Sequence, residues 1–261
     1  MEHNRTATEH DQLYWQYEYD VAAQYLIPLL KQWNIPIEGA TFLDIGCGDG
    51  GGLSAFADAG MICKGFDIEK YRIDLSKILS DQRSFETITG NIYDTPPPFK
   101  GETFDIVLLH DVFEHLIYKT EALEIIRGYL APKGRLIITF PPYYSAFGAH
   151  QQLLLSPLGK IPFIHLFPFI NTKIIPNLPN ERKPFVAEIL KLGRMKMGIT
   201  EFERIVRSCG FTIESRKFFL ISPNHIRFGL KPVSAGIFGS IPIIREFTVS
   251  GTVFSLKSSC Q

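Results

Sequence analysis

The sequence predicts an α/β protein with a seven-stranded, mainly parallel sheet, helices on both faces and an antiparallel last strand. Short β-rich runs alternate with helical stretches from Thr41 to Phe140, the alternation then stops, and two more β-rich runs follow near the end of the chain. Such alternation is typical of βα units, whose parallel strands are covered by helices on both faces. A sheet of this kind binds ligands beyond the carboxyl ends of its strands.

Length and composition are those of a globular protein, with one large domain that carries insertions or two small domains, and we expect a single domain, residues 1–261. The chain is 45% hydrophobic, and 27 lysines and arginines balance 27 aspartates and glutamates. Because the net charge is zero, no overall basic field draws the protein to nucleic acid, and a small or neutral partner is expected. The sequence leaves the oligomeric state open.

Cysteine spacing and apolar runs predict the cellular location of the protein. The four cysteines lie far apart without C-x-x-C spacing, which favours reduced thiols over a disulfide framework or a zinc site. The start of the chain lacks an apolar signal-peptide core, and the richest apolar stretch, residues 161–170, is short and interrupted by prolines. We therefore expect a cytoplasmic protein without a transmembrane segment.

Residues 1–36 are expected to form an amphipathic helical segment beside the cofactor-binding core. Tyr14, Tyr17 and Val21 recur at helical spacing, and Tyr25 continues the pattern. Pro28 is expected to end or kink this helix, because proline lacks an amide hydrogen and its ring clashes with the preceding turn.

The cofactor-binding core is expected over residues 37–142, where strand-like and helix-like runs follow one another. The expected strands are TFLDIG (41–46), MICKGFDI (61–68), FETITGNI (85–92), FDIVLLH (104–110) and GRLIITF (134–140). The expected helices between them are GLSAFADAG (52–60), EKYRIDLSKILSD (69–81) and TEALEIIRGYL (120–130).

Residues 143–198 are expected to form a lid or substrate-binding insertion after the fifth strand. This segment is rich in proline, phenylalanine and lysine and shows no clear period. Its phenylalanines form either an apolar pocket wall or the small core of the lid itself: Phe147, Phe163, Phe167 and Phe169. Its local excess of lysine and arginine allows an acidic acceptor or peripheral contact with an anionic membrane, although a solvated face is the commoner explanation.

Residues 199–261 are expected to complete the fold with a last helix and two strands. ITEFERIVRSCG (199–210) is typical of a helix that is capped by Thr200 and ended by Gly210. FTIESRKFFLI (211–221) and GTVFSLKSS (251–259) are typical of two strands, antiparallel neighbours at the sheet edge.

The stretch LDIGCGDGGG (43–52) is the main candidate for a cofactor-binding loop. Glycine has no Cβ, so a glycine turn between a strand and a helix lets backbone N–H groups approach a ligand. Gly46, Gly48 and Gly51 also spell the G-x-G-x-x-G of dinucleotide-binding folds. Asp67, which ends the next strand, can accept hydrogen bonds from both ribose hydroxyls. These features fit a nicotinamide dinucleotide as well as other nucleoside cofactors.

Three aspartates favour a cationic cofactor at this loop. Asp44 lies two residues before the first glycine, Asp49 lies inside the loop, and Asp67 follows it. Carboxylates here would repel a pyrophosphate and attract a cation. S-adenosylmethionine carries a sulfonium and an ammonium group and is the expected cofactor.

With these residues in view, the chain resembles the class I S-adenosylmethionine-dependent methyltransferases, closely over 41–142 and loosely over the last two strands. Five segments carry the resemblance in the family's order: LDIGCGDG, GFDIE, GNIYD, FDIVLLHDVFEHL and LAPKGRLIITFPP. It implies a Rossmann-like sheet and transfer of a methyl group. The resemblance also implies which residues contact the cofactor. The methionine part would lie at Asp44, Gly46, Cys47 and Gly48, the ribose at Asp67, and the adenine at Ile68, Asn91 and Ile92. His110 would lie in the loop that runs beside the cofactor.

Candidate acceptor-side residues follow the fourth and fifth strands. The expected general bases are His150 and His115, because a hydroxyl acceptor loses a proton and histidine is the commonest base. Tyr143, Tyr144 and Asp111 are expected to line the acceptor site. We expect no metal, since the H-x-x-x-E-H spacing of residues 110–115 matches neither H-E-x-x-H nor H-x-x-E-H.

Methyl transfer to a small molecule, at an oxygen, is the function that these features favour. A methyltransferase acting on RNA or protein is a second reading, and the neutral charge counts against RNA. A non-catalytic module that binds a nucleotide cofactor is a third.

Overall fold

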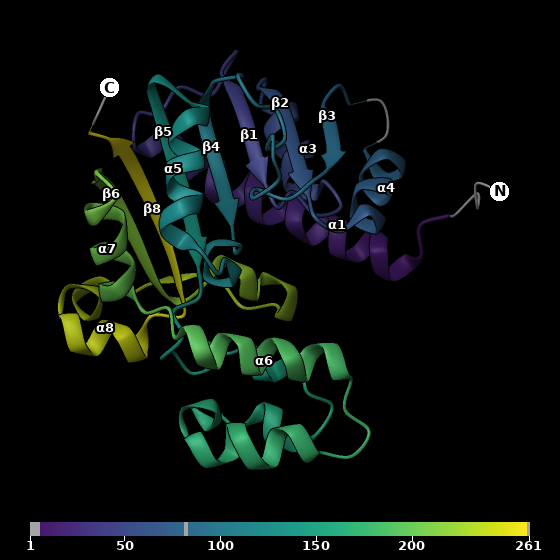
Figure 1. Ribbon diagram of the computed structural model, residues 1–261, viewed down its shortest axis with the longest axis vertical. Helices are drawn as coiled ribbons and strands as arrows, with labels where there is room; N and C mark the ends of the chain where they lie inside the picture. Colours follow the sequence, from purple (N-terminus) through teal and green to yellow (C-terminus); the bar gives the residue numbers. More distant parts are fainter. Residues whose placement is uncertain (1–5, 81–82, 260–261) are drawn as a thin grey trace.

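The computed structural model describes residues 6–80 and 83–259 and contains one eight-stranded sheet, in the order β3-β2-β1-β4-β5-β8-β6-β7 (Figure 1). The strands are β1 (Thr41–Ile45), β2 (Ile62–Asp67), β3 (Glu86–Thr89), β4 (Phe104–His110), β5 (Leu130–Phe140), β6 (Phe211–Ile221), β7 (Val233–Ser234) and β8 (Gly251–Ser258). The α-helices are α1 (Glu9–Val21), α2 (Ile27–Gln32), α3 (Gly51–Asp58), α4 (Lys70–Leu79), α5 (Lys119–Tyr129), α6 (Lys183–Met195), α7 (Ile199–Ser208) and α8 (Pro242–Thr248).

The sheet confirms the expected α/β fold and its antiparallel last strand. Strands β1 to β5 pair in parallel, while β8 runs antiparallel between β5 and β6. The eighth strand is β7, a two-residue edge strand that pairs with β6 and is too short to leave a sequence pattern. The strand order reverses between β1 and β4, and ligand crevices form at the carboxyl ends beside such a reversal.

The hydrophobic core fills both faces of the sheet, as expected for a helix-covered sheet. On one face, Phe140 of β5 packs against Phe202 of α7 and Phe254 of β8, with ring centroids 4.9 and 6.1 Å away. On the other face, Phe42 of β1 stacks on Phe56 of α3 at 4.2 Å. These rings are fully buried and fix the sheet whose edge carries the site.

The N-terminal helical segment continues past Pro28, so the expectation that Pro28 ends the helix is wrong, and a kink there stays a prediction. A capping box between Thr8 and Asp11 starts α1, a π-helical turn (η1, Ala22–Leu26) follows, and α2 continues the segment. Pro28 lies in the first turn of α2. A residue in that position needs no amide partner, so the proline is accommodated where the π-helical turn gives way to α2.

Helix α7, expected to be the last helix, is followed by α8 and is capped differently from the sequence expectation. Gly198, rather than Thr200, is the N-cap residue of α7. The carboxylate of Glu246 in α8 accepts hydrogen bonds from the amides of Ile199 and Thr200 and from the Thr200 hydroxyl, at 2.6–2.8 Å. A residue distant in sequence therefore satisfies the free amides of this helix.

The insertion (residues 143–198) lies below the sheet in Figure 1 and has its own small core. It contains the short turns η3 (Gln151–Leu153), η4 (Pro157–Lys160), η5 (Ile164–Leu166), η6 (Ile170–Ile174) and η7 (Ile175–Asn177), and it ends with α6. The prolines and lysines around α6 obscure its apolar period, which includes Ile189 and Leu192. Across residues 6–80 and 83–259, no helix has the length and hydropathy needed to cross a membrane.

Of the four phenylalanines proposed for the insertion, only Phe147 lines the cavity described below. Phe163, Phe167 and Phe169 are 36%, 58% and 67% exposed, so these three form neither a pocket wall nor a core. The insertion's core is instead built from Tyr143, Ala149, Leu154, Ile175, Ile189 and Leu192.

Candidate functional site

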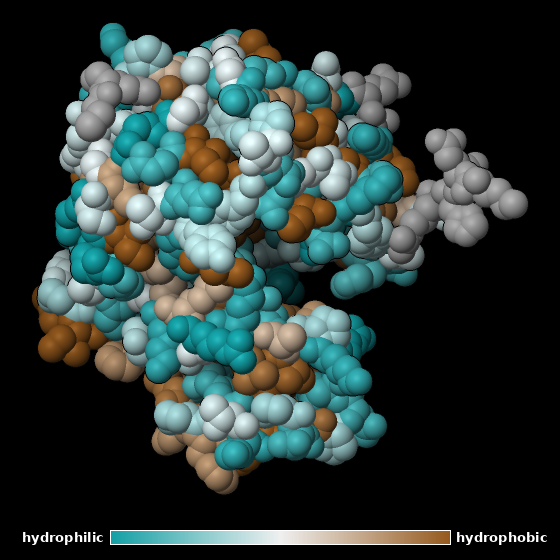
Figure 2. Space-filling model, viewed as in Figure 1, coloured by the Kyte–Doolittle hydropathy of each residue, from teal (hydrophilic) through white to brown (hydrophobic). Residues whose placement is uncertain are grey.

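A cavity of about 750 Å³ lies between the carboxyl ends of the central strands and the insertion. Figure 2 shows a hollow between the sheet domain and the insertion in the same region. The cavity is lined by the glycine loop, by α1, by the ends of β4 and β5, by the start of the insertion and by η8 (Pro223–Phe228). Its volume lies within the usual range for ligand sites.

The glycine loop turns tightly beneath this cavity. The amides of Gly46 and Cys47 both donate to the carbonyl of Phe66, at 2.8 and 3.1 Å. Gly46 has φ +80°, and a Cβ there would lie 2.5 Å from a methyl group of Val112. Both the turn and the close packing therefore require glycine at this position.

Asp67 connects the glycine loop to the next strand. One carboxylate oxygen accepts from the amide of Gly48 at 3.0 Å and the other from the amide of Glu69 at 2.8 Å. Asp67 lines the cavity although it is largely buried. The residue expected to bind ribose thus also fixes the loop expected to hold the methionine part.

Asp44 fits the cationic part of the expected cofactor. Its side chain lines the cavity, and Oδ1 is buried without a hydrogen-bond partner among the residues that the structure describes. Burial, with Glu18 and Asp67 nearby, raises the pKa of Asp44 to about 7 despite the opposing effect of His110. A buried acceptor without a donor is costly, and an ammonium group would satisfy it.

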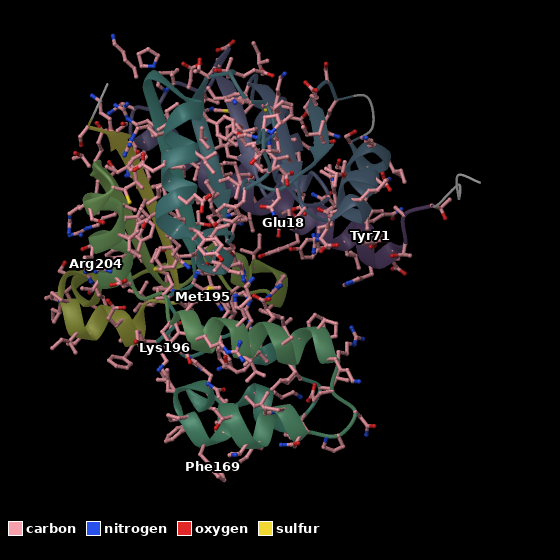
Figure 3. All side chains as sticks on the ribbon, in the orientation of Figure 1. Glu18, Tyr71, Phe169, Met195, Lys196 and Arg204 are labelled. Carbon is pink, nitrogen blue, oxygen red and sulfur yellow. The ribbon has the colours of Figure 1, made fainter. Side chains whose placement is uncertain are left out.

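Helix α1 supplies a wall of the cavity that the sequence analysis did not assign to the site. Tyr14, Tyr17 and Glu18 line it, with Arg72 of α4 beside them, 5.0 Å from the Tyr14 ring. Figure 3 shows Glu18 at the edge of the sheet domain that faces the insertion. The helical spacing of the tyrosines was the available signal, but it did not distinguish a cavity face from a core face.

The residues expected to contact adenine lie outside the cavity lining. Ile68 is 62% exposed directly after β2, Ile92 is buried in the core, and the amide of Asn91 donates to Asp94 at 2.7 Å. Their role towards adenine stays a prediction.

His110 and Asp111, at the end of β4, both line the cavity. Nδ1 of His110 lies 2.8 Å from the hydroxyl of Thr139, and Nε2 lies 3.8 Å from Glu18. Burial alone would lower the pKa of His110, but the surrounding carboxylates outweigh it and raise this pKa. The Asp111 carboxylate accepts from Thr139 and from Asn224 of η8, so both of its oxygens are already engaged.

Three residues from the two loops expected on the acceptor side come together beside the cavity: Glu114 and His115 of η2 (Phe113–His115) and His150 of the insertion. Nδ1 of His115 lies 2.5 Å from Oε1 of Glu188 in α6, and Nε2 lies 3.5 Å from Oε1 of Glu114. The rings of His115 and His150 are 5.4 Å apart. Both expected general bases therefore share one wall of the cavity.

The pKa values of the two imidazoles on this wall shift in opposite directions. Burial and the neighbouring His115 lower the pKa of His150 to about 4, so His150 is neutral near pH 7. Burial opposes the charged form of His115 too, but Glu114 and Glu188 outweigh it and raise the pKa of His115. Burial raises the pKa of Glu114 to about 7.

Tyr143 and Tyr144, expected to line the acceptor site, are not among the residues that line the cavity. Tyr143 is buried in the insertion's core and donates to the carbonyl of His165 at 3.3 Å. Tyr144 packs against Tyr143 and lies near Phe247 of α8. The Tyr144 ring therefore joins the insertion to α8, whereas the Tyr143 ring stays within the insertion's core. The contact of either ring with an acceptor stays a prediction.

A Rossmann-like sheet with this strand order, a glycine turn after β1 and an acidic residue ending β2 defines the class I methyltransferase architecture. Residues 43–138 match the family model described as the methyltransferase domain. This match and the fold support a class I S-adenosylmethionine-dependent methyltransferase.

Solved structures share this fold at low sequence identity. Magnesium protoporphyrin IX methyltransferase from Synechocystis PCC 6803, with bound SAH, is 15% identical with a TM-score of 0.53, over 98% of this chain and 90% of that chain. The plantazolicin methyltransferase in complex with SAH is 14% identical with a TM-score of 0.54, over 95% and 84% of the two chains.

Curated relatives match shorter parts of the chain. The cypemycin N-terminal methyltransferase of Streptomyces sp is 28% identical over 153 residues, 54% of this chain and 61% of its own length. A ubiquinone biosynthesis O-methyltransferase of Brucella melitensis biotype 2 is 37% identical over 86 residues, 31% of this chain and 33% of its own length. The matches thus span less than two thirds of these relatives.

Proposed function

We propose that this protein transfers the methyl group of S-adenosylmethionine to a hydroxyl oxygen of a small molecule bound between the sheet and the insertion. The observation that carries the proposal is one cavity lined both by Asp44 and the glycine loop and by His115 and His150. When bound, S-adenosylmethionine supplies a methyl group on a sulfonium, which is an excellent leaving group. The protein's task is then to hold the acceptor close, aligned and away from water.

A small acceptor is supported by the position of the insertion. The cavity is lined on this side by Ser145, Ala146, Phe147 and His150 and by Phe185 of α6, so donor and acceptor would share one cavity. We propose that the insertion acts as a lid and that residues 1–261 work as one domain. Buried free cysteines at positions 47, 63 and 209 are compatible with work in the cytoplasm.

An oxygen acceptor is supported by the imidazoles at the far end of the cavity. Neutral His150 can receive the proton that a hydroxyl releases, whereas His115 is already engaged by Glu188. The Brucella relative, named as an O-methyltransferase, points the same way.

A second candidate acceptor is the terminal amine of a peptide. It is favoured by the match of 153 residues to a protein named as an N-terminal methyltransferase. A neutral amine needs no base for methylation, so His150 would then be dispensable for the transfer.

The test has two stages. Calorimetry with S-adenosylmethionine, SAH and NAD establishes the cofactor, and NAD is expected not to bind. Incubating the protein and isotopically labelled donor with a metabolite extract, followed by mass spectrometry, is expected to reveal a labelled O-methyl ether or ester. A labelled N-terminal amine would instead favour the second candidate, and tight NAD binding would contradict the proposal.

Replacing Asp67 by alanine is expected to weaken S-adenosylmethionine binding. The loss of one charge-assisted hydrogen bond costs about 1.5–3 kcal/mol, which corresponds to roughly one to two orders of magnitude in Kd. Asp67→Asn keeps one acceptor oxygen for the amide of Gly48. It therefore distinguishes the loss of ribose binding from the loss of the hydrogen bond that holds the glycine loop. Calorimetry measures both variants, with Asp74→Ala on exposed α4 as the control. Unchanged affinity in a folded Asp67→Ala protein would overturn the ribose assignment.

Cofactor affinity is expected to fall as the pH drops below about 7. Burial raises the pKa of Asp44 to about 7, so its carboxyl is increasingly protonated at lower pH. A bound ammonium requires the carboxylate, and the proton must leave first, so Kd rises by up to about tenfold per pH unit. Asp49, whose pKa burial raises to about 6, acts in the same direction. Titrations between pH 5.5 and 7 should show this slope, and Asp44→Asn should flatten it; an equal slope in that variant would contradict the assignment.

A further inference from the structure

Two imidazoles and one carboxylate converge where the insertion meets the end of β4. Each of Glu114, His115 and His150 offers one ligand atom, and these atoms all lie within 4.8 Å of one another. Nε2 of His115 is 3.5 Å from Oε1 of Glu114. Ligand atoms at about 2.0–2.2 Å from a tetrahedral ion are roughly 3.3–3.6 Å apart, so this pair needs almost no movement to share one.

The Glu114 carboxylate is buried without a hydrogen-bond donor among the described residues. Its side chain is 3% exposed, and neither oxygen accepts a hydrogen bond from any part of the chain that the structure describes. The approach of His115 Nε2, at 3.5 Å, is longer than an N–H···O hydrogen bond. A buried carboxylate is normally paired, hydrogen-bonded or bound to a metal.

His115 is oriented as metal-binding histidines are. Its Nδ1 lies 2.5 Å from the Glu188 carboxylate, which directs Nε2 towards Glu114. A carboxylate on the far nitrogen fixes the tautomer of a ligating imidazole and increases its basicity. Glu188 comes from α6, so the insertion supplies both a ligand and the support for another.

We propose that Glu114, His115 and His150 bind a divalent transition-metal ion of the zinc type. Mixed imidazole and carboxylate ligands suit such ions, and three protein ligands leave a position for a further oxygen. His115 and His150 line the cavity, so that position is accessible from the acceptor side. The sequence spacing alone did not indicate a site, because the third ligand comes from the insertion.

The consequence for catalysis rests on the proposed function. A coordinated acceptor hydroxyl loses its proton more easily, so the ion would replace a free base and His150 would act as its ligand. Binding of the ion also links the insertion to the sheet domain. Neither the binding nor its test depends on the methyl transfer.

The test is a zinc titration of the untagged full chain, freed of metal by a chelator, without donor or acceptor. We expect one equivalent to bind, and Co²⁺ in its place to show visible d–d bands typical of low coordination. His150→Ala and Glu114→Gln should each weaken zinc binding by about 100-fold or more, and Glu188→Gln by about 10- to 100-fold. His225→Ala, a cavity histidine outside the cluster, should bind zinc as the wild type does.

The outcomes separate this inference from the proposed function. Circular dichroism and S-adenosylmethionine binding show that each variant is folded. Absence of stoichiometric zinc binding, or equal binding by the wild type, His150→Ala and Glu114→Gln, would overturn the metal site even if methyl transfer is observed. Zinc binding that depends on these residues would support the site even if no acceptor is ever methylated.

Discussion

Turnover is expected to fall by about 10²- to 10⁴-fold when His150 is replaced by alanine, while S-adenosylmethionine affinity stays nearly unchanged. His150 faces the end of the cavity near His115, whereas the expected methionine contacts lie at the glycine loop. We therefore propose that the imidazole acts on the acceptor, either as the proton acceptor or as a metal ligand. Measuring kcat, the acceptor KM and the donor Kd on one preparation distinguishes an effect on the acceptor side from an effect on cofactor binding.

A second variant controls for the backbone at this position. His150 has φ +58°, in the left-handed region, which alanine adopts at a cost and asparagine tolerates better. His150→Asn is therefore expected to lose turnover as well, without the added strain. If His150 only anchors the insertion, both variants would instead raise the acceptor KM and keep kcat at saturation. Full turnover in a folded His150→Asn protein would exclude both chemical roles.

The sequence predicts the parts of the fold that are specified by residue patterns within a short window. Each βα unit from β1 to β5 carries its own alternation, and the glycine loop carries its own turn residues, so these elements follow from short windows. The two-residue strand β7 and the π-helical turn over residues 22–26 leave no such pattern. Their formation depends on pairing and packing with distant parts of the chain.

In the candidate site, too, only the residues on elements with a local sequence pattern could be predicted. Asp44, Gly46 and Asp67 lie on consecutive elements whose carboxyl ends must meet at one edge, so their proximity could be predicted. His115 and His150 were both expected on the acceptor side, but the contact of His115 with Glu188 depends on how the insertion folds back, which no short window specifies. Glu188 was missed for that reason, and a tyrosine such as Tyr143 was assigned to the acceptor side although its ring belongs to the insertion's own core.

The base of the insertion depends on a buried ion pair between two helices. Glu203 of α7 and Arg245 of α8 are 6% and 5% exposed, and the two nitrogens of the arginine lie 3.1 Å from the two carboxylate oxygens. Arg216 of β6 also donates to Glu203, at 2.5 Å. The neighbouring Glu246 caps the first amides of α7, so the pair helps to hold α8 where the insertion rejoins the sheet domain.

Glu203→Ala is expected to lower the free energy of unfolding by about 3–5 kcal/mol, because it leaves the buried Arg245 charge without its carboxylate. Glu201→Ala is the matched control on the same helix: its pair with Arg204 is exposed and screened by solvent, so little or no loss is expected. Urea unfolding should show a lower midpoint with an unchanged slope for the first variant. Replacing both partners, as Glu203→Leu with Arg245→Met, is expected to recover much of the loss, since no buried unpaired charge then remains and Arg216, which also loses its partner, is 44% exposed. A Glu203→Ala protein no less stable than the Glu201→Ala control would show that this pair does not stabilise the junction.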